Sequence, residues 1–166
     1  MLLTQRATVA VAAQLLIAYS SIAGAEPSSI QAGLIEELHY WIDTTTVLPA
    51  ADTSATIVFV DAQDLAEPSE MASMIGSTPR GLYDPDTGTI SLVRPWSAEN
   101  PQDVAVLLHE LVHHRQGGKH FYCEAAKEHA AYHVQKNWLA EREITLDVNW
   151  IAIVLASSCA VRDTHP

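Results

Sequence analysis

Residues 100–118 have the sequence NPQDVAVLLHELVHHRQGG, which carries the start, the apolar face and the end of one helix. Asn100 suits the N-cap, Pro101 the first helical position, and Asp103 the positive end of the helix dipole. Five apolar residues then recur at helical spacing, and the pair Gly117-Gly118 ends the segment. These apolar residues are Val104, Leu107, Leu108, Leu111 and Val112. We therefore predict a buried helix over this stretch.

The middle of the predicted helix contains His109-Glu110-Leu111-Val112-His113, the pentapeptide HExxH. Histidines four residues apart lie on one helical face and can direct two imidazole nitrogens at one metal ion. Glu110 is turned by about 100° around the axis, so it can reach a metal-bound water without being a ligand. The spacing predicts a zinc site with a general base beside it. Two core histidines satisfied by backbone hydrogen bonds are the alternative.

A catalytic zinc ion usually takes three protein ligands and one water, so a third ligand must come from elsewhere in the chain. The extended pattern HExxHxxGxxH would supply a histidine, but His120 lies one residue too far from His113. A glutamate from a following antiparallel helix fits better, because Glu124 and Glu128 lie four apart and share a helical face. We choose Glu128, whose neighbouring alanines would let two helices approach closely, and keep Glu124 and His120 as alternatives.

The order of HExxH and Glu128-x-x-Ala131, about fifteen residues later, resembles the gluzincin class of zinc metallopeptidases. The longer pattern is also similar to small exported bacterial proteins of undefined activity. It consists of HELVHHRQ followed by Glu128, Ala131-Tyr132, Gln135 and Trp138-Leu139. The resemblance implies a zinc ion held by His109, His113 and Glu128, and hydrolysis of peptide bonds.

In that chemistry zinc lowers the pKa of its bound water to about 7, and Glu110 takes the water's proton and passes it to the leaving amine. One more donor usually supports the oxyanion. Tyr132 is our candidate, because it lies four residues beyond Glu128 on the same helical face; a tyrosine that only packs in the core is the alternative. The alternatives are His120, His129 and His133. Carboxylates are expected to orient the ligand imidazoles, and His114 and Arg115 are expected near the ligands or at the surface.

The remaining patterns predict a small α+β domain, with a short antiparallel sheet that contains a hairpin and with a helical second half, a minimal zincin-like domain. In zinc peptidases the edge strand of such a sheet often binds an extended peptide; a hairpin that only completes the sheet is the alternative. The expected elements are a helix at 28–43, a strand at 55–60, a loop with a helical turn at 61–78, hairpin strands at 80–83 and 89–93, and helices at about 121–141 and 144–158.

The first 25 residues have the pattern of a secretory signal peptide. Arg6 gives a modest positive charge, residues 7–18 are apolar, and Ala23-Gly24-Ala25 fits a cleavage site. The apolar run is too short and too rich in alanine for a convincing membrane span, and a retained anchor is the alternative. We expect a periplasmic or extracellular protein whose mature part, residues 26–166, forms one metal-binding domain.

The formal net charge is −11, which argues against binding to nucleic acid or to anionic membranes. Residues 148–156 are apolar but long enough only for a packed helix, so no stable membrane insertion is expected after cleavage. The predicted partner is therefore a peptide or protein substrate.

The two cysteines, Cys123 and Cys159, both lie in the exported part. One disulfide is the simplest expectation there, with a chain-entropy contribution of about 3–4 kcal/mol. Two free thiols or a cysteine-ligated zinc are the alternatives.

A function of another class also fits the residues. An exported zinc-binding or interaction protein could keep the site without cleaving peptides. Glu110 discriminates between the two, because binding alone does not require a general base at that position, and its presence favours an enzyme.

Overall fold

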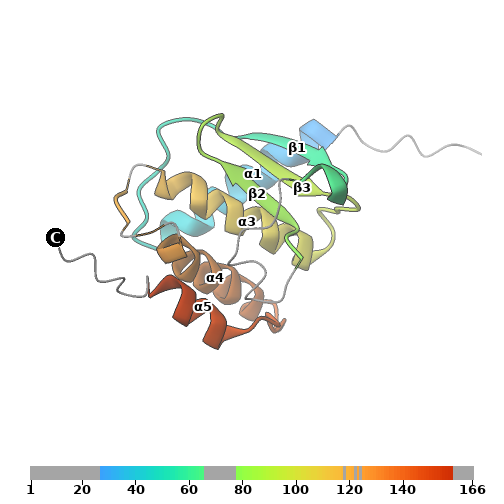
Figure 1. Cartoon of the computed structure of the whole chain (residues 1–166). Coiled ribbons are helices and arrows are strands. Elements are labelled where there is room, and N and C mark those ends of the chain that lie inside the picture. Colours follow the sequence, from blue (N-terminus) through green and yellow to red (C-terminus); the bar gives the residue numbers. More distant parts are fainter. Residues whose placement is uncertain (1–26, 66–77, 118, 122, 124, 159–166) are drawn as a thin grey trace, which may run out of the picture.

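The computed structural model describes residues 27–65, 78–117, 119–121, 123 and 125–158, with only the backbone described for residues 27–32. The domain combines a small sheet with helices, so the predicted α+β class is confirmed (Figure 1). In chain order the elements are α1 Pro27–Thr45, β1 Thr56–Val60, the short 3-10 helix η1 Ala62–Asp64, β2 Gly81–Asp84, β3 Thr89–Val93, α3 Pro101–Gln116, α4 Ala125–Ala140 and α5 Trp150–Ser157.

The sheet has the strand order β1-β3-β2. Strands β2 and β3 form the predicted antiparallel hairpin, whose turn places Gly88 at a φ of 66°, a backbone conformation that favours glycine. Strand β1 pairs parallel with β3, so the sheet is mixed and the expectation of a wholly antiparallel sheet is wrong. Two parallel strands need a long connection between them. Here the chain forms β2 at the far edge of the sheet before it returns as β3, between β1 and β2. Strand β2 therefore lies at an edge.

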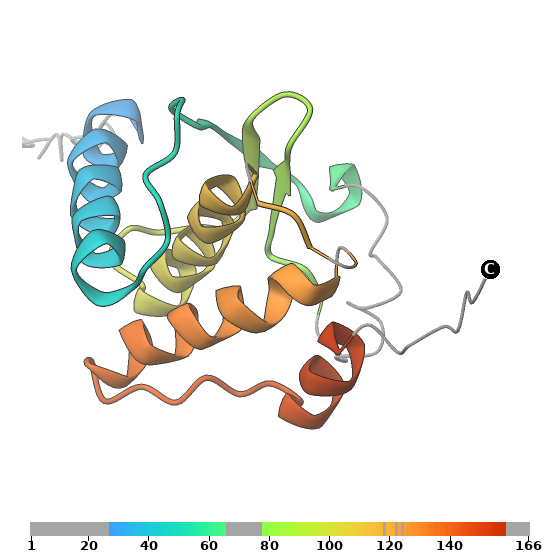
Figure 2. The same ribbon diagram turned by 90° about the vertical axis from the view of Figure 1, so that its left-hand side faces the viewer.

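Helix α3 lies at the centre of the molecule, between the sheet, α1 and α4 (Figure 2). Its predicted ends are confirmed: the Asn100 side chain accepts a hydrogen bond from Gln102 N–H, Pro101 is the first residue, and Gly117 follows the last turn. All five predicted apolar residues of the helix are buried. They pack against buried residues of α1, β3 and α4, which include Leu38, Ile42, Ile90, Leu92, Ala131 and Leu139.

Helix α4 runs antiparallel to α3, as predicted. Contacts between the helices join positions of rising number on α3 to positions of falling number on α4: His109 contacts Gln135, and Gln116 contacts Lys127. The small residue Ala131 is fully buried between them. This close antiparallel packing brings the middle of α3 against the first turns of α4.

The prediction of a continuous helix over 144–158 is wrong in its first half. Along residues 144–149 partly buried and exposed side chains alternate, which is the period of extended backbone. Ile144 and Leu146 pack on the main core, whereas Val148 packs on a small cluster with Ala152 and Ile153. Helix α5 begins only at Trp150, where the Asn149 side chain caps it by accepting a hydrogen bond from Ala152 N–H.

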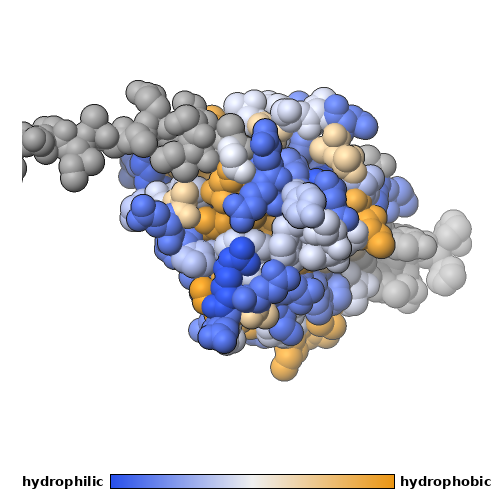
Figure 3. Space-filling model, turned by 180° about the vertical axis from the view of Figure 1, so that it is seen from behind, coloured by the Kyte–Doolittle hydropathy of each residue, from blue (hydrophilic) through white to orange (hydrophobic). Residues whose placement is uncertain are grey.

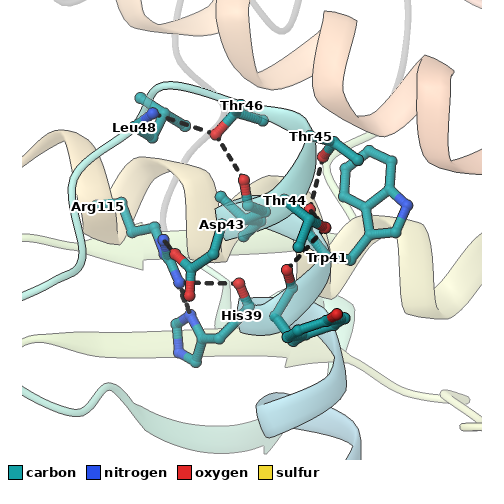
Figure 4. A network of polar contacts seen from close by, with 10 residues as sticks. His39, Trp41, Asp43, Thr44, Thr45, Thr46, Leu48 and Arg115 are labelled. Atoms are coloured by element: carbon teal, nitrogen blue, oxygen red, sulfur yellow. Dashed lines mark hydrogen bonds and ion pairs between the residues drawn. The ribbon is translucent and has the colours of Figure 1, made fainter.

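Arg115 joins α3 to α1 and is buried, contrary to the expectation that it lies near the ligands or at the surface. Its guanidinium donates to Nδ1 of His39 at 2.9 Å and to the His39 carbonyl at 3.1 Å, and forms an ion pair with Asp43 (Figure 4). Burying the guanidinium requires these partners, because an unpaired buried charge is costly. The network therefore fixes how α1 sits on the central helix.

The back of the molecule is covered mainly by hydrophilic residues, with apolar residues in small separate groups (Figure 3). No helix within the described part of the chain is long and apolar enough to span a membrane. The signal peptide at 1–25 and Cys159, one partner in the predicted disulfide with Cys123, lie outside the described part, so both predictions stay predictions.

We predict that His39 makes the domain less stable at mildly acidic pH. Burial and the Arg115 charge lower the pKa of His39 from its ordinary value of 6.5. The unfolded chain therefore binds a proton more readily than the folded one, and stability falls as the pH drops through 6.5 toward the folded pKa. The Arg115 hydrogen bond lowers the pKa of Asp43 below 3.8, so Asp43 loses its contribution only in stronger acid.

The measurement is urea unfolding at pH 7.5 and 5.0 for the wild type and for His39→Asn. The asparagine amide oxygen can accept from Arg115 but does not titrate in this range. The variant should lose less stability than the wild type between the two pH values. An equal loss in both proteins would contradict the assignment.

Candidate metal centre

Helices α3 and α4 bring together three side chains that were predicted from separate parts of the sequence. His109 Nε2 lies 3.0 Å from His113 Nε2 and 3.2 Å from Glu128 Oε2, and His113 Nε2 lies 3.4 Å from Glu128 Oε1. One ligand atom from each residue lies within 4.8 Å of the others. Within the described part of the chain, this is the one group of three His, Cys, Asp or Glu side chains that could hold a metal ion.

The outer nitrogens of both imidazoles bind glutamine amide oxygens, where carboxylates were expected. His109 Nδ1 lies 3.1 Å from Gln135 Oε1, and His113 Nδ1 lies 3.0 Å from Gln116 Oε1. The amide nitrogen of Gln116 donates to the Lys127 carbonyl at 3.0 Å, which fixes the orientation of this amide. An amide oxygen only accepts, so both Nδ1 atoms carry the hydrogen and both Nε2 lone pairs face Glu128.

This arrangement of electron pairs fits a metal cation. Two imidazole lone pairs and a carboxylate converge within 3.4 Å, and a cation between them offsets their repulsion. Burial alone would raise the pKa of Glu128, but its contacts with the imidazoles of His109 and His113 hold it well below its usual range. Although burial opposes it, the neighbouring Glu128 and Glu110 raise the pKa of His113. Two imidazoles and one carboxylate are a donor set that zinc takes in catalytic sites.

Glu110 lies on the neighbouring face of α3, toward β2, and is not one of the three converging ligands. Only 6% of its surface is exposed, and burial raises the pKa of its carboxyl group. The nearby His109 and His113 act in the opposite direction, as does a hydrogen bond from the backbone N–H of Tyr83. The carboxylate is therefore held at the sheet edge beside the ligand histidines.

Gly81 permits this approach of strand and helix. A Cβ atom at position 81 would lie 2.7 Å from Glu110 Oε1 and 2.8 Å from Val106 Cγ1, closer than real Cβ contacts. Sequence reasoning did not single out Gly81 as a site residue. Gly81 lies two residues before Tyr83 on the predicted hairpin, so both residues share one face of the strand. This position is the signal by which the sequence could have identified Gly81.

The structure places Tyr132 beside the ligands: its ring packs edge-on against that of His109, with centroids 4.5 Å apart. The side chains of the alternative donors are exposed. His129 and His133 are exposed neighbours on α4, and His120 is exposed and not part of the group of three. Glu124, the alternative ligand, lies outside the described residues.

His114 was expected near the ligands or at the surface, and it is instead a buried link between α3 and the sheet. Its Nε2 lies 2.8 Å from the Thr53 carbonyl, and its Nδ1 lies 3.1 Å from the hydroxyl of Tyr83. The two adjacent histidines of the HELVHH pattern thus face different partners. His113 faces α4, and His114 faces β2.

The chain belongs to the family described as "Domain of unknown function (DUF6647)", which matches residues 27–166. No curated protein and no solved structure matches the chain.

We predict that Gly81→Ala destabilises the domain by about 1–3 kcal/mol, the usual range for overpacking. The new methyl group must displace Glu110 and Val106, and Glu110 is buried with little room to move. Zinc stoichiometry should remain near one, because the candidate ligands lie on a different face of α3 from Glu110 and Val106. Urea unfolding and metal analysis provide the two measurements.

Gly33→Ala is the matched control, because a Cβ atom at position 33 meets nothing within 4 Å. Alanine favours a helix more than glycine does, so this variant should be neutral or slightly more stable. Equal stability of Gly81→Ala and the wild type would show that β2 does not approach Glu110 as described.

We also predict that Gln135→Met weakens zinc binding about 10- to 100-fold, the usual effect of removing a partner that orients a ligand imidazole. Methionine has a similar length but lacks the amide oxygen that holds His109. Competition with a chromophoric chelator measures the affinity. Gln102→Met, at an exposed position of α3, is the control and should bind zinc like the wild type; an equal affinity in both variants would refute the role of Gln135.

Proposed function

We propose that this protein is an exported zinc-dependent metallopeptidase that hydrolyses peptide bonds with Glu110 as general base. The observation that carries the proposal is the relation between two faces of α3. One face presents His109 and His113 to Glu128, and the next face presents a buried carboxylate beside them. A ligand set of three leaves a fourth zinc position open, which distinguishes a catalytic from a structural site.

His109, His113 and Glu128 would hold the zinc ion, which when bound supplies Lewis acidity toward a carbonyl and toward water. Glu110 then accepts the proton of the attacking water and delivers it to the leaving amine. Its burial supports this role, because burial raises the pKa of a carboxyl group toward the pH at which it must both take and give a proton. Tyr132, beside His109, is the proposed donor to the oxyanion.

The position of β2 supports a peptide substrate. Val93 N–H donates to the Arg80 carbonyl, so the main-chain groups of Arg80 face β3. Main-chain groups alternate in direction along an antiparallel strand, and those of Gly81 and Tyr83 therefore point away from β3. Tyr83 N–H meets Glu110, which leaves the main chain of Gly81 as a partner for an extended peptide beside the base. A protein or peptide bound there would lie along the edge of the sheet.

Export is part of the proposal. It is supported by the leader pattern of residues 1–25, after which the family match begins at residue 27. A periplasmic or extracellular location is also one in which Cys123 and Cys159 could form a disulfide.

We predict that Glu110→Gln retains zinc but loses at least about a hundredfold in peptide hydrolysis, within the range that general base catalysis contributes. Glutamine can still accept the Tyr83 N–H but cannot take a proton from water. Cleavage of a peptide library by the mature protein, with and without a chelator, measures the activity, and metal analysis measures the zinc.

Glu128→Ala is the companion variant, and it should lose both zinc and activity. Full activity of Glu110→Gln would overturn the mechanism. Zinc binding by a wild type that cleaves no peptide would favour a zinc-binding or interaction protein instead.

A further inference from the structure

We propose that His114 is a positioning residue for Glu110 and acts through Tyr83. The role in hydrolysis rests on the proposed function, whereas the structural coupling does not. His114 holds the Tyr83 hydroxyl, Tyr83 fixes the register of β2 on α3, and the backbone N–H of Tyr83 thereby holds the Glu110 carboxylate.

The direction of the hydrogen bonds follows from the chemistry of the partners. The Thr53 carbonyl can only accept, so His114 Nε2, at 2.8 Å, carries the hydrogen. In the neutral ring Nδ1 then accepts, and the Tyr83 hydroxyl donates to it at 3.1 Å. The two rings are also packed edge to face, with centroids 5.3 Å apart. Both ring nitrogens of His114 thus form hydrogen bonds, and the side chain is buried. Neither nitrogen is left to bind a metal ion.

The spacing on both elements matches. Glu110 and His114 are four residues apart and share one face of α3, and Gly81 and Tyr83 are two apart and share one face of β2. Gly81 meets Glu110, and the hydroxyl of Tyr83 meets His114 one helical turn further along. These two contacts set the register of strand against helix.

An edge strand needs such contacts more than a central one. Strand β2 pairs with β3 on one side only, and its Leu82 side chain, which points to the other face, is 39% exposed. The position of Tyr83 N–H under Glu110 therefore depends on side chains that tie β2 to α3. Without the tyrosine hydroxyl, the strand keeps its pairing with β3 but loses its hydrogen bond to His114 on the helix.

The test is Tyr83→Phe, which removes one oxygen atom and keeps the ring. Hydrogen exchange followed by NMR should show faster exchange of the residue 83 amide than in the wild type, while amides in α3 and α4 and the zinc stoichiometry stay unchanged. Turnover should fall on the order of tenfold, with KM within twofold, because the base is misplaced while the ligands are not. Tyr40→Phe, at a tyrosine that is 71% exposed, is the control and should change none of these.

Two further variants separate positioning from general stability. His114→Leu should reproduce the faster exchange at residue 83, whereas His114→Gln, which can donate to Thr53 and accept from Tyr83, should restore much of the protection. Combining Tyr83→Phe with His114→Leu should accelerate exchange of this amide no more than His114→Leu alone.

Unchanged exchange at residue 83 in Tyr83→Phe would overturn the proposal, and so would an equal acceleration of all amides. The exchange measurement decides the coupling even if the protein hydrolyses no peptide. Failure of the proposed function would appear separately, as an inactive wild type or a fully active Glu110→Gln.

Discussion

The convergence of two imidazole lone pairs and a carboxylate between α3 and α4 is the constraint on which the rest of the structure depends. Buried acceptors that face one another are unfavourable unless a cation lies between them. Holding them there requires a rigid helix pair, and the buried leucines of α3 and the fully buried Ala131 of α4 supply the close packing. The site and the core are therefore built from the same two helices.

Helix α3 contacts each neighbouring element with a different face. His109 and His113 face α4, Glu110 and His114 face β2, and Arg115 reaches α1. In the second half of α3 most polar side chains are buried and cannot turn to solvent, so each of these groups needs a hydrogen-bond partner. This explains why the HELVHHRQ stretch is polar and buried at once.

Local signals predicted α3 and placed His109 and His113 on one of its faces, because the cap at Asn100 and the spacing of the two histidines lie within a few residues. The choice of Glu128 needed only one further helix and its face. Partners set by tertiary contact were missed: Gln135 meets His109 across 26 positions. Its spacing of seven from Glu128 puts it on the same face of α4, but a glutamine there does not by itself indicate this role. The parallel pairing of β1 was missed for the same reason. The alternation at 144–149 was present in the sequence but was assigned the wrong period.

The two faces of α3 also bear on what the site is for. Gln116 and Gln135 orient the ligands as carboxylates would, but add no negative charge beside Glu128. The carboxylate of Glu110 is different: its burial disfavours the charged form, and Gly81 must lack a side chain for it to fit. Zinc binding does not need this second, costly carboxylate as a ligand, since it is not one of the three converging side chains. Hydrolysis needs a base of raised pKa at that position, so the cost of burying Glu110 is the feature that favours an enzyme over a metal store.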